Sequence, residues 1–502
     1  MRAGIKGSRR SVTAAIITLT TFLSYAGSPA LADATLGVPP VARYTSGTTI
    51  TWEPCPEDAA AQCGTMRVPA DWTKPYGPSI ELTLARRPAG DRSQRIGVLM
   101  VNPGGPGASA VNQALDTEYF GSDVERRFDI VGIDPRGVGR SSPILCAQDV
   151  VDAKPSPLAV NETEFGALTT YNRRLAADCA SRSGPVFHQA GTGNVVRDMD
   201  AVRIALGEEK ISFYGASYGS LIGQMYAERY PARLRALVLD SVMDHSADVE
   251  AFLGRTAESA QDAFDQFVAW CARDTQCALR GRDIRAIWKR LVEQARAGKL
   301  QDPYDPPSKL GLWELITAAF SAFYDPQWYS FAFYLKAAYE PGPAARRALP
   351  DLDLTPHSFP AVMCRDWALP VGGWSGYRAL LDGMAGKAPQ MLASPLALTA
   401  VSGCAGWPDP VTDPQRPNPR AAGPVLVVNA RHDPATAYAW AKSVTRQLGP
   451  EARLLTYDGW GHVAYGHSDC VSGAVDEYLI GLTLPADGKT CPPVPPVPYG
   501  VG

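Results

Sequence analysis

Ser217 lies in the stretch "FYGASYGSLI" (residues 213–222), with Gly215 and Gly219 each two residues away. The residues before the serine are typical of a strand, and those after it carry apolar residues at helical spacing. This pattern predicts a tight strand-to-helix turn, in which a Cβ atom at either flanking position would clash. A chance match in a chain with 46 glycines is the alternative. Because such a turn exposes a hydroxyl, we interpret Ser217 as a nucleophile.

A serine hydroxyl is a weak nucleophile at neutral pH, so it needs a base that a carboxylate orients. Asp433 follows the expected strand "PVLVVNARH", and His462 follows "RLLTYDGWG". Both fall on loops after strands, in the chain order serine, acid, histidine. Asp240 is the alternative acid, and His467 is the alternative base. We expect Asp433 to orient His462 next to Ser217.

Acyl transfer places negative charge on a substrate oxygen, which requires hydrogen-bond donors. The backbone N–H of Tyr218, directly after the serine, is one expected donor. The Gly-rich loop "NPGGPG" (residues 102–107) offers a second donor, with Gly105 favoured over its neighbour Gly104. Phosphate binding is the competing interpretation of this loop, but no Gly-Lys-Ser or Gly-Lys-Thr follows. We therefore expect an oxyanion hole at this loop.

Strands and helices of an α/β protein must position these loops. The early strands are short and interrupted by Pro and Gly, which is typical of an antiparallel start to a sheet. Later runs such as "IGVLMVN" and "LRALVLD" are continuously apolar and alternate with helices, which indicates a mostly parallel sheet covered on both faces. From about residue 245 to 423 the chain becomes helical and aromatic. We expect this insertion to form a cap over the carboxyl ends of the strands.

The N-terminus has the pattern of an export signal. Basic residues precede a short apolar stretch, and alanines at positions 30 and 32 frame a cleavage site. The apolar stretch is shorter than the ~20 residues of a spanning helix, so we expect no membrane association after signal removal. The predicted division is a signal over residues 1–32, a sheet core over 33–244 and 424–502, and a helical cap over 245–423. The mature protein is expected to be secreted.

Charge and cysteine content limit the possible partners. The 502 residues carry 48 Lys and Arg against 51 Asp and Glu, a net charge of −3, so no basic footprint indicates nucleic acid. Ten cysteines agree with an oxidising compartment. No Cys-x-x-Cys occurs, so we expect no metal and no cofactor. Sequence leaves the connectivity open, and chain-neighbour pairing is the simplest arrangement: Cys55 with Cys63, Cys146 with Cys179, Cys271 with Cys277, Cys364 with Cys404, and Cys470 with Cys491.

Five motifs in order carry a resemblance to a known family. They are "NPGGPGAS", "DPRGVGRSS", "GASYGS", "NARHDPAT" and "GWGHVAYG", with the long insertion before the last two. Together they resemble the secreted tripeptidyl aminopeptidases, α/β-hydrolases related to proline iminopeptidases. The resemblance implies an α/β-hydrolase fold, with Ser217 as nucleophile, Asp433 as orienting acid and His462 as general base and acid. Asn102 stands where proline iminopeptidases carry a histidine, so their specificity is not carried over.

The expected function is release of single residues, dipeptides or tripeptides from peptides with free N-termini by a monomeric exported enzyme. A secreted carboxylesterase with the same triad is the alternative, because the same machinery hydrolyses esters. A non-catalytic binding module would usually lack part of the triad. A buried substrate ammonium requires a carboxylate, so we expect the cap to present one near the serine. The candidate is Asp366 in "VMCRDWALP", next to Cys364; the alternative is a solvated or Arg365-paired carboxylate.

Overall fold

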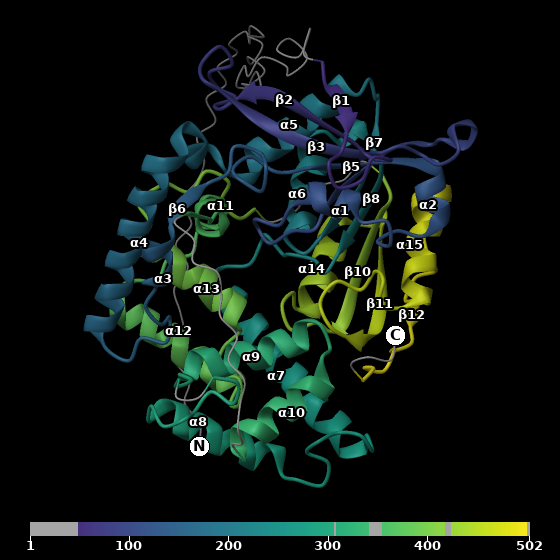
Figure 1. Cartoon of the computed structure of the whole chain (residues 1–502). Helices are drawn as coiled ribbons and strands as arrows, with labels where there is room; N and C mark the ends of the chain where they lie inside the picture. Colours follow the sequence, from purple (N-terminus) through teal and green to yellow (C-terminus); the bar gives the residue numbers. More distant parts are fainter. Residues whose placement is uncertain (1–48, 306–307, 341–353, 417–422, 499–502) are drawn as a thin grey trace, which may run out of the picture. The chain divides into compact units, whose positions relative to one another are not determined.

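The computed structural model describes residues 49–305, 308–340, 354–416 and 423–498 (Figure 1). The predicted signal at residues 1–32 and its cleavage site lie outside these ranges. Within the part of the chain that the structure describes, no helix has both the length and the apolar character needed to cross a membrane. In the same ranges, no group of three or more His, Cys, Asp or Glu residues is placed to hold a metal ion.

A ten-stranded sheet forms the centre of the fold, in the order β1-β2-β3-β5-β4-β7-β8-β10-β11-β12 (Figure 1). The pairs β1–β2, β2–β3 and β3–β5 are antiparallel, and the remaining pairs are parallel. The predicted mostly parallel sheet with an antiparallel start is confirmed. The strands are β1 (Thr51–Pro54), β2 (Gln62–Pro69), β3 (Ser79–Arg87), β4 (Gly97–Asn102), β5 (Phe128–Ile133), β7 (Ile211–Ala216), β8 (Leu234–Asp240), β10 (Val425–His432), β11 (Ala452–Trp460) and β12 (Thr490–Cys491).

Helices cover both faces because the central strands are apolar on both. Every residue of β4, β5 and β7 is buried, and alternate residues enter two separate hydrophobic cores. One core includes residues of α1 (Ala110–Leu115), α2 (Ser122–Arg127) and α15 (Asp469–Gly481). The other includes residues of α5 (Thr192–Ala205), α6 (Tyr218–Arg229) and α14 (Tyr438–Leu448). The chain runs from β4 to β5 on one side and reaches β7 on the other, so β4 and β7 flank a switch point.

The segment between β8 and β10 is helical, as the loss of βα alternation predicts. Its helices pack through a buried aromatic core that includes Trp270, Trp288 and Trp328. The helices are α7 (Val249–Arg273), α8 (Ile284–Arg296), α9 (Leu312–Tyr324), α10 (Trp328–Tyr339), α11 (Phe359–Asp366), α12 (Gly373–Lys387) and α13 (Pro395–Cys404).

The inserted helices also contact an excursion of the chain before β7. There β6 (Leu145–Ala147) leads into α3 (Gln148–Asp152) and α4 (Glu162–Ser183), and β6 pairs antiparallel with β9 (Leu354–Pro356) of the insertion. Helix α4 contacts α12 and α13. Two segments that are distant in sequence therefore pack together around the inserted helices.

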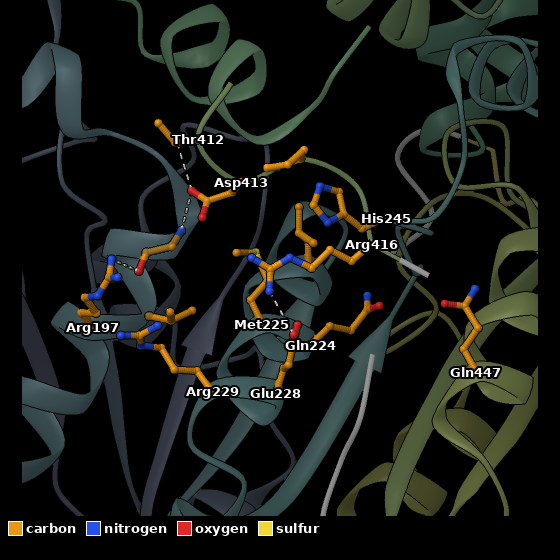
Figure 2. A pocket seen from close by; sticks show the side chains of 14 residues that line it. Arg197, Gln224, Met225, Glu228, Arg229, His245, Thr412, Asp413, Arg416 and Gln447 are labelled. Atoms are coloured by element: carbon orange, nitrogen blue, oxygen red, sulfur yellow. Dashed lines mark hydrogen bonds and ion pairs between the residues drawn. The ribbon is translucent and has the colours of Figure 1, made fainter. Parts of the chain in front are cut away.

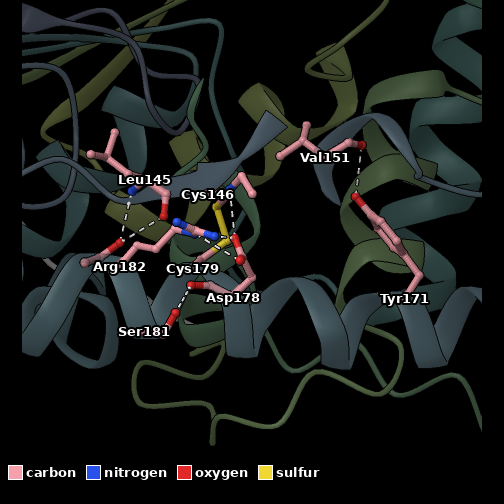
Figure 3. Close-up of a disulfide and its surroundings, with 10 residues drawn as sticks. Leu145, Cys146, Val151, Tyr171, Asp178, Cys179, Ser181 and Arg182 are labelled. Carbon is pink, nitrogen blue, oxygen red and sulfur yellow. Dashed lines mark hydrogen bonds and ion pairs between the residues drawn. A yellow bond between two sulfur atoms is a disulfide. The ribbon is translucent and has the colours of Figure 1, made fainter. Parts of the chain in front are cut away.

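All ten cysteines form disulfides, in the chain-neighbour arrangement. The bond between Cys146 and Cys179 joins β6 to α4, as Figure 3 shows. Next to it the Asp178 carboxylate accepts a hydrogen bond from the Ala147 amide at 2.8 Å, and the Ser183 hydroxyl accepts one from the Leu145 amide at 3.0 Å. The disulfide and these hydrogen bonds fix the end of α4 against the small sheet.

Replacing Cys146 and Cys179 together with alanine should lower the free energy of unfolding by about 2–5 kcal/mol, because the bond spans 33 residues of chain. Urea unfolding of the mature protein measures the change. The matched control is the pair Cys271 and Cys277, which spans only 6 residues, so the same replacement should cost less. Equal stability of the Cys146/Cys179 variant and the wild type would contradict the expectation.

Candidate active site

Ser217 stands at the turn between β7 and α6. Its backbone has φ 55° and ψ −123°, a strained conformation for a residue with a side chain, and its side chain is buried. A Cβ atom at Gly215 would collide with the backbone of Gly219, and one at Gly219 would collide with the carbonyl oxygen of Asn102. The turn therefore requires glycine at both flanking positions, as the sequence pattern predicts.

Asp433 and His462 meet although they follow different strands, β10 and β11. The His462 Nδ1 atom lies 3.0 and 3.1 Å from the two carboxylate oxygens of Asp433, and both side chains are fully buried. Neither of the two alternatives that sequence left open, Asp240 and His467, takes part in this contact. The carboxylate fixes Nδ1 as the protonated nitrogen, which leaves Nε2 as the acceptor.

Several donors surround the Asp433 carboxylate. It accepts hydrogen bonds from the Ala435 and Thr436 amides at 2.8 and 2.9 Å, and from the hydroxyls of Thr436 and Ser241 at 2.7 and 2.8 Å. Burial alone would raise the pKa of Asp433, but the interaction with His462 and the hydrogen bonds from Thr436 outweigh it and lower the pKa below its usual value. Asp433 is therefore ionised at neutral pH.

Asp240, the alternative acid, bonds to the loop that follows His462 and not to the histidine side chain. Its carboxylate accepts hydrogen bonds from the Ala464 and Tyr465 amides at 3.0 and 2.9 Å and from the Tyr214 hydroxyl at 2.9 Å. The next residue, Ser241, accepts a hydrogen bond from the amide that follows His462 at 2.8 Å. Asp240 and Ser241 thus hold the loop that carries the histidine. The role of Ser241 was not predicted from the sequence, although its position directly after a strand and an aspartate could have indicated it.

Tyr324 of the inserted helix α9 contacts both the histidine and the serine. Its ring centroid is 4.4 Å from that of His462, and its carbonyl oxygen accepts a hydrogen bond from the His462 amide at 2.8 Å. Its side chain also interacts with Ser217, which opposes the rise that burial causes in the pKa of Tyr324. The His462 Nε2 atom is buried and has no hydrogen-bond partner among the described residues. The Ser217 hydroxyl therefore does not hydrogen-bond to Nε2 in this structure, and this nitrogen is an unoccupied acceptor.

The loop after β4 packs directly on the serine turn. Gly104 has φ 94°, and a Cβ atom there would lie 2.7 Å from the Tyr218 amide nitrogen. The Gly104 amide donates to the Asn102 side-chain oxygen at 2.9 Å, whereas the Gly105 amide has no hydrogen-bond acceptor in the described parts of the chain. The Tyr218 amide belongs to the first turn of α6, where intrahelical acceptors are absent. Gly105 and Tyr218 are thus the amides with free donor capacity here.

A narrow cavity lies over Ser217, Gly105 and Tyr218. The inserted helices α7, α11 and α13 form its roof, and the described residues that line it include no charged side chain. The apolar roof residues are Phe252, Phe359, Met363, Leu396, Ala397 and Ala400. The expected acidic side chain of the cap is therefore not found in the wall of this cavity.

Asp366 lies elsewhere than an ammonium anchor would require. It does not line the cavity at Ser217, and it is neither solvated nor paired with Arg365, which bonds to Asp409. Its carboxylate accepts hydrogen bonds from the Thr192 amide at 2.9 Å, the Thr192 hydroxyl at 2.5 Å and the Tyr218 hydroxyl at 2.6 Å. All three donors belong to the sheet core, so Asp366 ties α11 to the residue that follows the serine. We correct the anchor interpretation accordingly.

The fold and the site define a serine hydrolase of the α/β-hydrolase class. Comparison with family models agrees: one described as "TAP-like protein" matches residues 389–491, and one described as "alpha/beta hydrolase fold" matches residues 97–315. Three relatives match over most of their length. Serine protease Hip1 of Mycobacterium tuberculosis is 32% identical over 488 residues, covering 89% of this chain and 91% of the relative.

Carboxylesterase B of the same organism is 34% identical over 509 residues, covering 92% of each chain. Tripeptidyl aminopeptidase of Streptomyces lividans is 30% identical over 471 residues, covering 88% of this chain and 87% of the relative. The chain belongs to the tripeptidyl aminopeptidase family of α/β-hydrolases, as the sequence motifs predict.

The buried Asp366 carboxyl should make stability depend on pH. Burial, reinforced by the nearby Asp413 charge, raises the pKa of Asp366 from 3.8 to about 7. Between pH 4 and 7 the folded chain therefore retains a proton that the unfolded chain has lost, and the stability that this proton contributes falls as pH rises. The variant Asp366→Asn cannot ionise, so its melting temperature relative to wild type should increase from pH 4.5 to pH 8.

Asp382→Asn, on the exposed side of α12, is the matched control and should follow the wild-type profile. Thermal unfolding of wild type and both variants across this pH range makes the comparison. A constant difference between Asp366→Asn and wild type would show that Asp366 does not titrate in this window.

Proposed function

We propose that the chain is an exported serine aminopeptidase that cleaves single residues, dipeptides or tripeptides from peptides with free N-termini. In this proposal Ser217 is the nucleophile, His462 the general base and acid, and Asp433 the orienting carboxylate. The amides of Gly105 and Tyr218 form the oxyanion hole. The proposal rests on the contact between Asp433 and His462, the free Nε2 acceptor and the strained turn at Ser217.

The proposed reaction has two stages. As the Ser217 oxygen bonds to the scissile carbonyl carbon, His462 Nε2 takes the hydroxyl proton, and the carbonyl electron pair moves to the substrate oxygen. The Gly105 and Tyr218 amides donate to this oxyanion. Its collapse breaks the carbon–nitrogen bond, and His462 gives its proton to the leaving amine. A water molecule, deprotonated by His462, then hydrolyses the acyl-enzyme and restores the serine.

The observation that favours an exopeptidase is the roof over the serine. Helices α7, α11 and α13 line the cavity at Ser217 from the insertion, which would limit the length of polypeptide that can pass over the serine. A substrate that enters a covered site is most easily cleaved near its end. The name of the Streptomyces lividans relative, tripeptidyl aminopeptidase, agrees with this direction.

A secreted carboxylesterase is the second candidate. The described residues that line the serine cavity are uncharged and largely apolar, which suits an acyl chain as well as a peptide. One relative is named Carboxylesterase B. The two candidates differ in the leaving group and in whether a free amine is required, so substrates decide between them.

Export and a monomeric state also belong to the proposal. Five disulfides suit an oxidising compartment, and a signal over residues 1–32 would direct the chain there. The predicted cap over residues 245–423 is inserted into a core of residues 33–244 and 424–502. In this proposal the cap controls access of substrate to the serine.

Ser217→Ala should reduce kcat/KM on peptide substrates by at least roughly a thousandfold, because no other group supplies the attacking oxygen. His462→Ala should cause a loss of similar size, and His467→Ala is its matched control, expected to remain close to wild type. Steady-state kinetics, with circular dichroism to verify folding, measure these effects. Wild-type activity of Ser217→Ala on both peptides and esters would refute the nucleophile assignment.

The wild-type enzyme should hydrolyse a tripeptidyl p-nitroanilide with a free amine at least about tenfold faster, in kcat/KM, than its N-acetylated counterpart. The reason is that an aminopeptidase binds the terminal ammonium of its substrate, and acetylation removes that charge. p-Nitrophenyl butyrate in the same assay tests the esterase alternative. Equal hydrolysis of free and blocked peptides would exclude the aminopeptidase, and a strong preference for the ester would favour the carboxylesterase.

A further inference from the structure

A second cavity, of about 320 Å³, lies between α5, α6, residues 412–416 and α14. Its volume is within the usual range of ligand pockets, roughly 300–1,000 Å³. It shares no lining residue with the cavity at Ser217. The residues of α6 that face it, among them Leu221, Gln224 and Glu228, occupy one side of that helix. This cavity is therefore a separate feature of the surface.

Two arginines of this cavity have no ion pair with a carboxylate among the described residues. Arg197 of α5 donates through Nη1 to the Gly193 carbonyl at 3.1 Å and the Asn194 side chain at 2.9 Å, and its buried Nε atom has no acceptor in the described residues. Arg229, at the end of α6, donates to the Tyr230 hydroxyl at 3.2 Å, and its guanidinium carbon lies 5.6 Å from the centroid of the Tyr230 ring. Figure 2 shows both side chains on the same side of the cavity. Unused guanidinium donors thus converge on one wall.

The two acidic side chains of the cavity, Asp413 and Glu228, bond to groups other than these two arginines. Asp413 accepts hydrogen bonds from the Gly193 amide and the Thr412 hydroxyl, each at 3.2 Å. Glu228 pairs with Arg416 at 3.2 Å, as Figure 2 shows. Neither acid forms an ion pair with Arg197 or Arg229. The two unpaired guanidinium groups therefore retain their charge for a ligand.

The balance of charge in the cavity favours an anion. Three arginines face two acids, and burial lowers the pKa of His245, so this histidine is uncharged at neutral pH. Burial together with the neighbouring Arg229 lowers the pKa of Arg197, although the nearby Tyr230 and Asp413 oppose the shift. Adjacent guanidinium groups bind carboxylate and phosphate oxygens through paired N–H donors.

The rest of the wall indicates which anion fits. Met225 and Pro414 give part of the cavity wall an apolar surface next to the arginines, and the buried side chains of Val196 and Leu221 lie behind it. A small inorganic anion would leave this apolar surface in contact with water, whereas a carboxylate on a short hydrocarbon chain would cover it. We propose that this cavity is a binding site for a small organic carboxylate, held by Arg197 and Arg229.

Isothermal titration calorimetry on the mature enzyme tests the proposal with hexanoate, acetate and inorganic phosphate at constant ionic strength. Hexanoate should bind saturably and more tightly than acetate, because its chain covers the apolar wall. Arg197→Gln and Arg229→Gln should each weaken hexanoate binding by about tenfold or more, since a charged hydrogen bond is lost. The matched control is Arg446→Gln, an exposed arginine of α14 outside the cavity, which should bind like wild type.

Arg229→Gln should keep the wild-type kcat/KM on peptides, which shows that the enzyme remains folded. If Arg197→Gln unfolds, Arg197→Lys keeps the charge and should show intermediate affinity. Absence of saturable hexanoate binding, or equal binding by wild type and the Arg229→Gln variant, would overturn the proposal. Binding of phosphate without binding of hexanoate would overturn the organic carboxylate and assign the cavity to inorganic anions.

Discussion

Two consecutive residues at the end of β8, Asp240 and Ser241, hydrogen-bond to the three loops that carry Ser217, Asp433 and His462. The Asp240 carbonyl accepts from the Ser217 amide at 2.8 Å, and the Ser241 hydroxyl donates to Asp433 at 2.8 Å. The same hydroxyl accepts from the amide after His462 at 2.8 Å. Each loop follows a different strand, so the registers of β7, β8, β10 and β11 set the relative positions of these groups. A shift of one strand would separate them.

Three buried aspartates have different roles in this fold: Asp240 and Asp366 hold loops and helices together, and Asp433 contacts the candidate catalytic histidine. Burial raises the pKa of Asp240 although two backbone amides and the Tyr214 hydroxyl bond to it. Burial likewise raises the pKa of Asp366. Asp433 differs because its direct contact with His462 and its hydrogen bonds from Thr436 outweigh its burial. Carboxyls that are equally buried thus have pKa values shifted in opposite directions, according to the groups that contact them.

The residue after the serine is held from two directions. The backbone of Tyr218 follows the strained turn, and its hydroxyl donates to Asp366 of the inserted helix α11 at 2.6 Å. A candidate oxyanion donor therefore depends on a contact with the insertion as well as on the sheet. Tyr324 of α9 makes a second such contact, because its carbonyl oxygen binds the His462 amide. The inserted helices roof the site and also take part in holding it.

Features that depend on short stretches of chain could be predicted from the sequence. The requirement for glycine at position 215 comes from a steric contact with Gly219, within five residues, and continuous apolar runs indicate buried parallel strands. The structure alone decided which polar side chains meet. Ser241 lies 222 residues before Val463, and Asp366 lies 148 residues after Tyr218, so only the packed sheet and insertion bring them together. The burial and the partners of Asp366 follow from the strand order and the packing of the insertion, and no local sequence pattern indicates them.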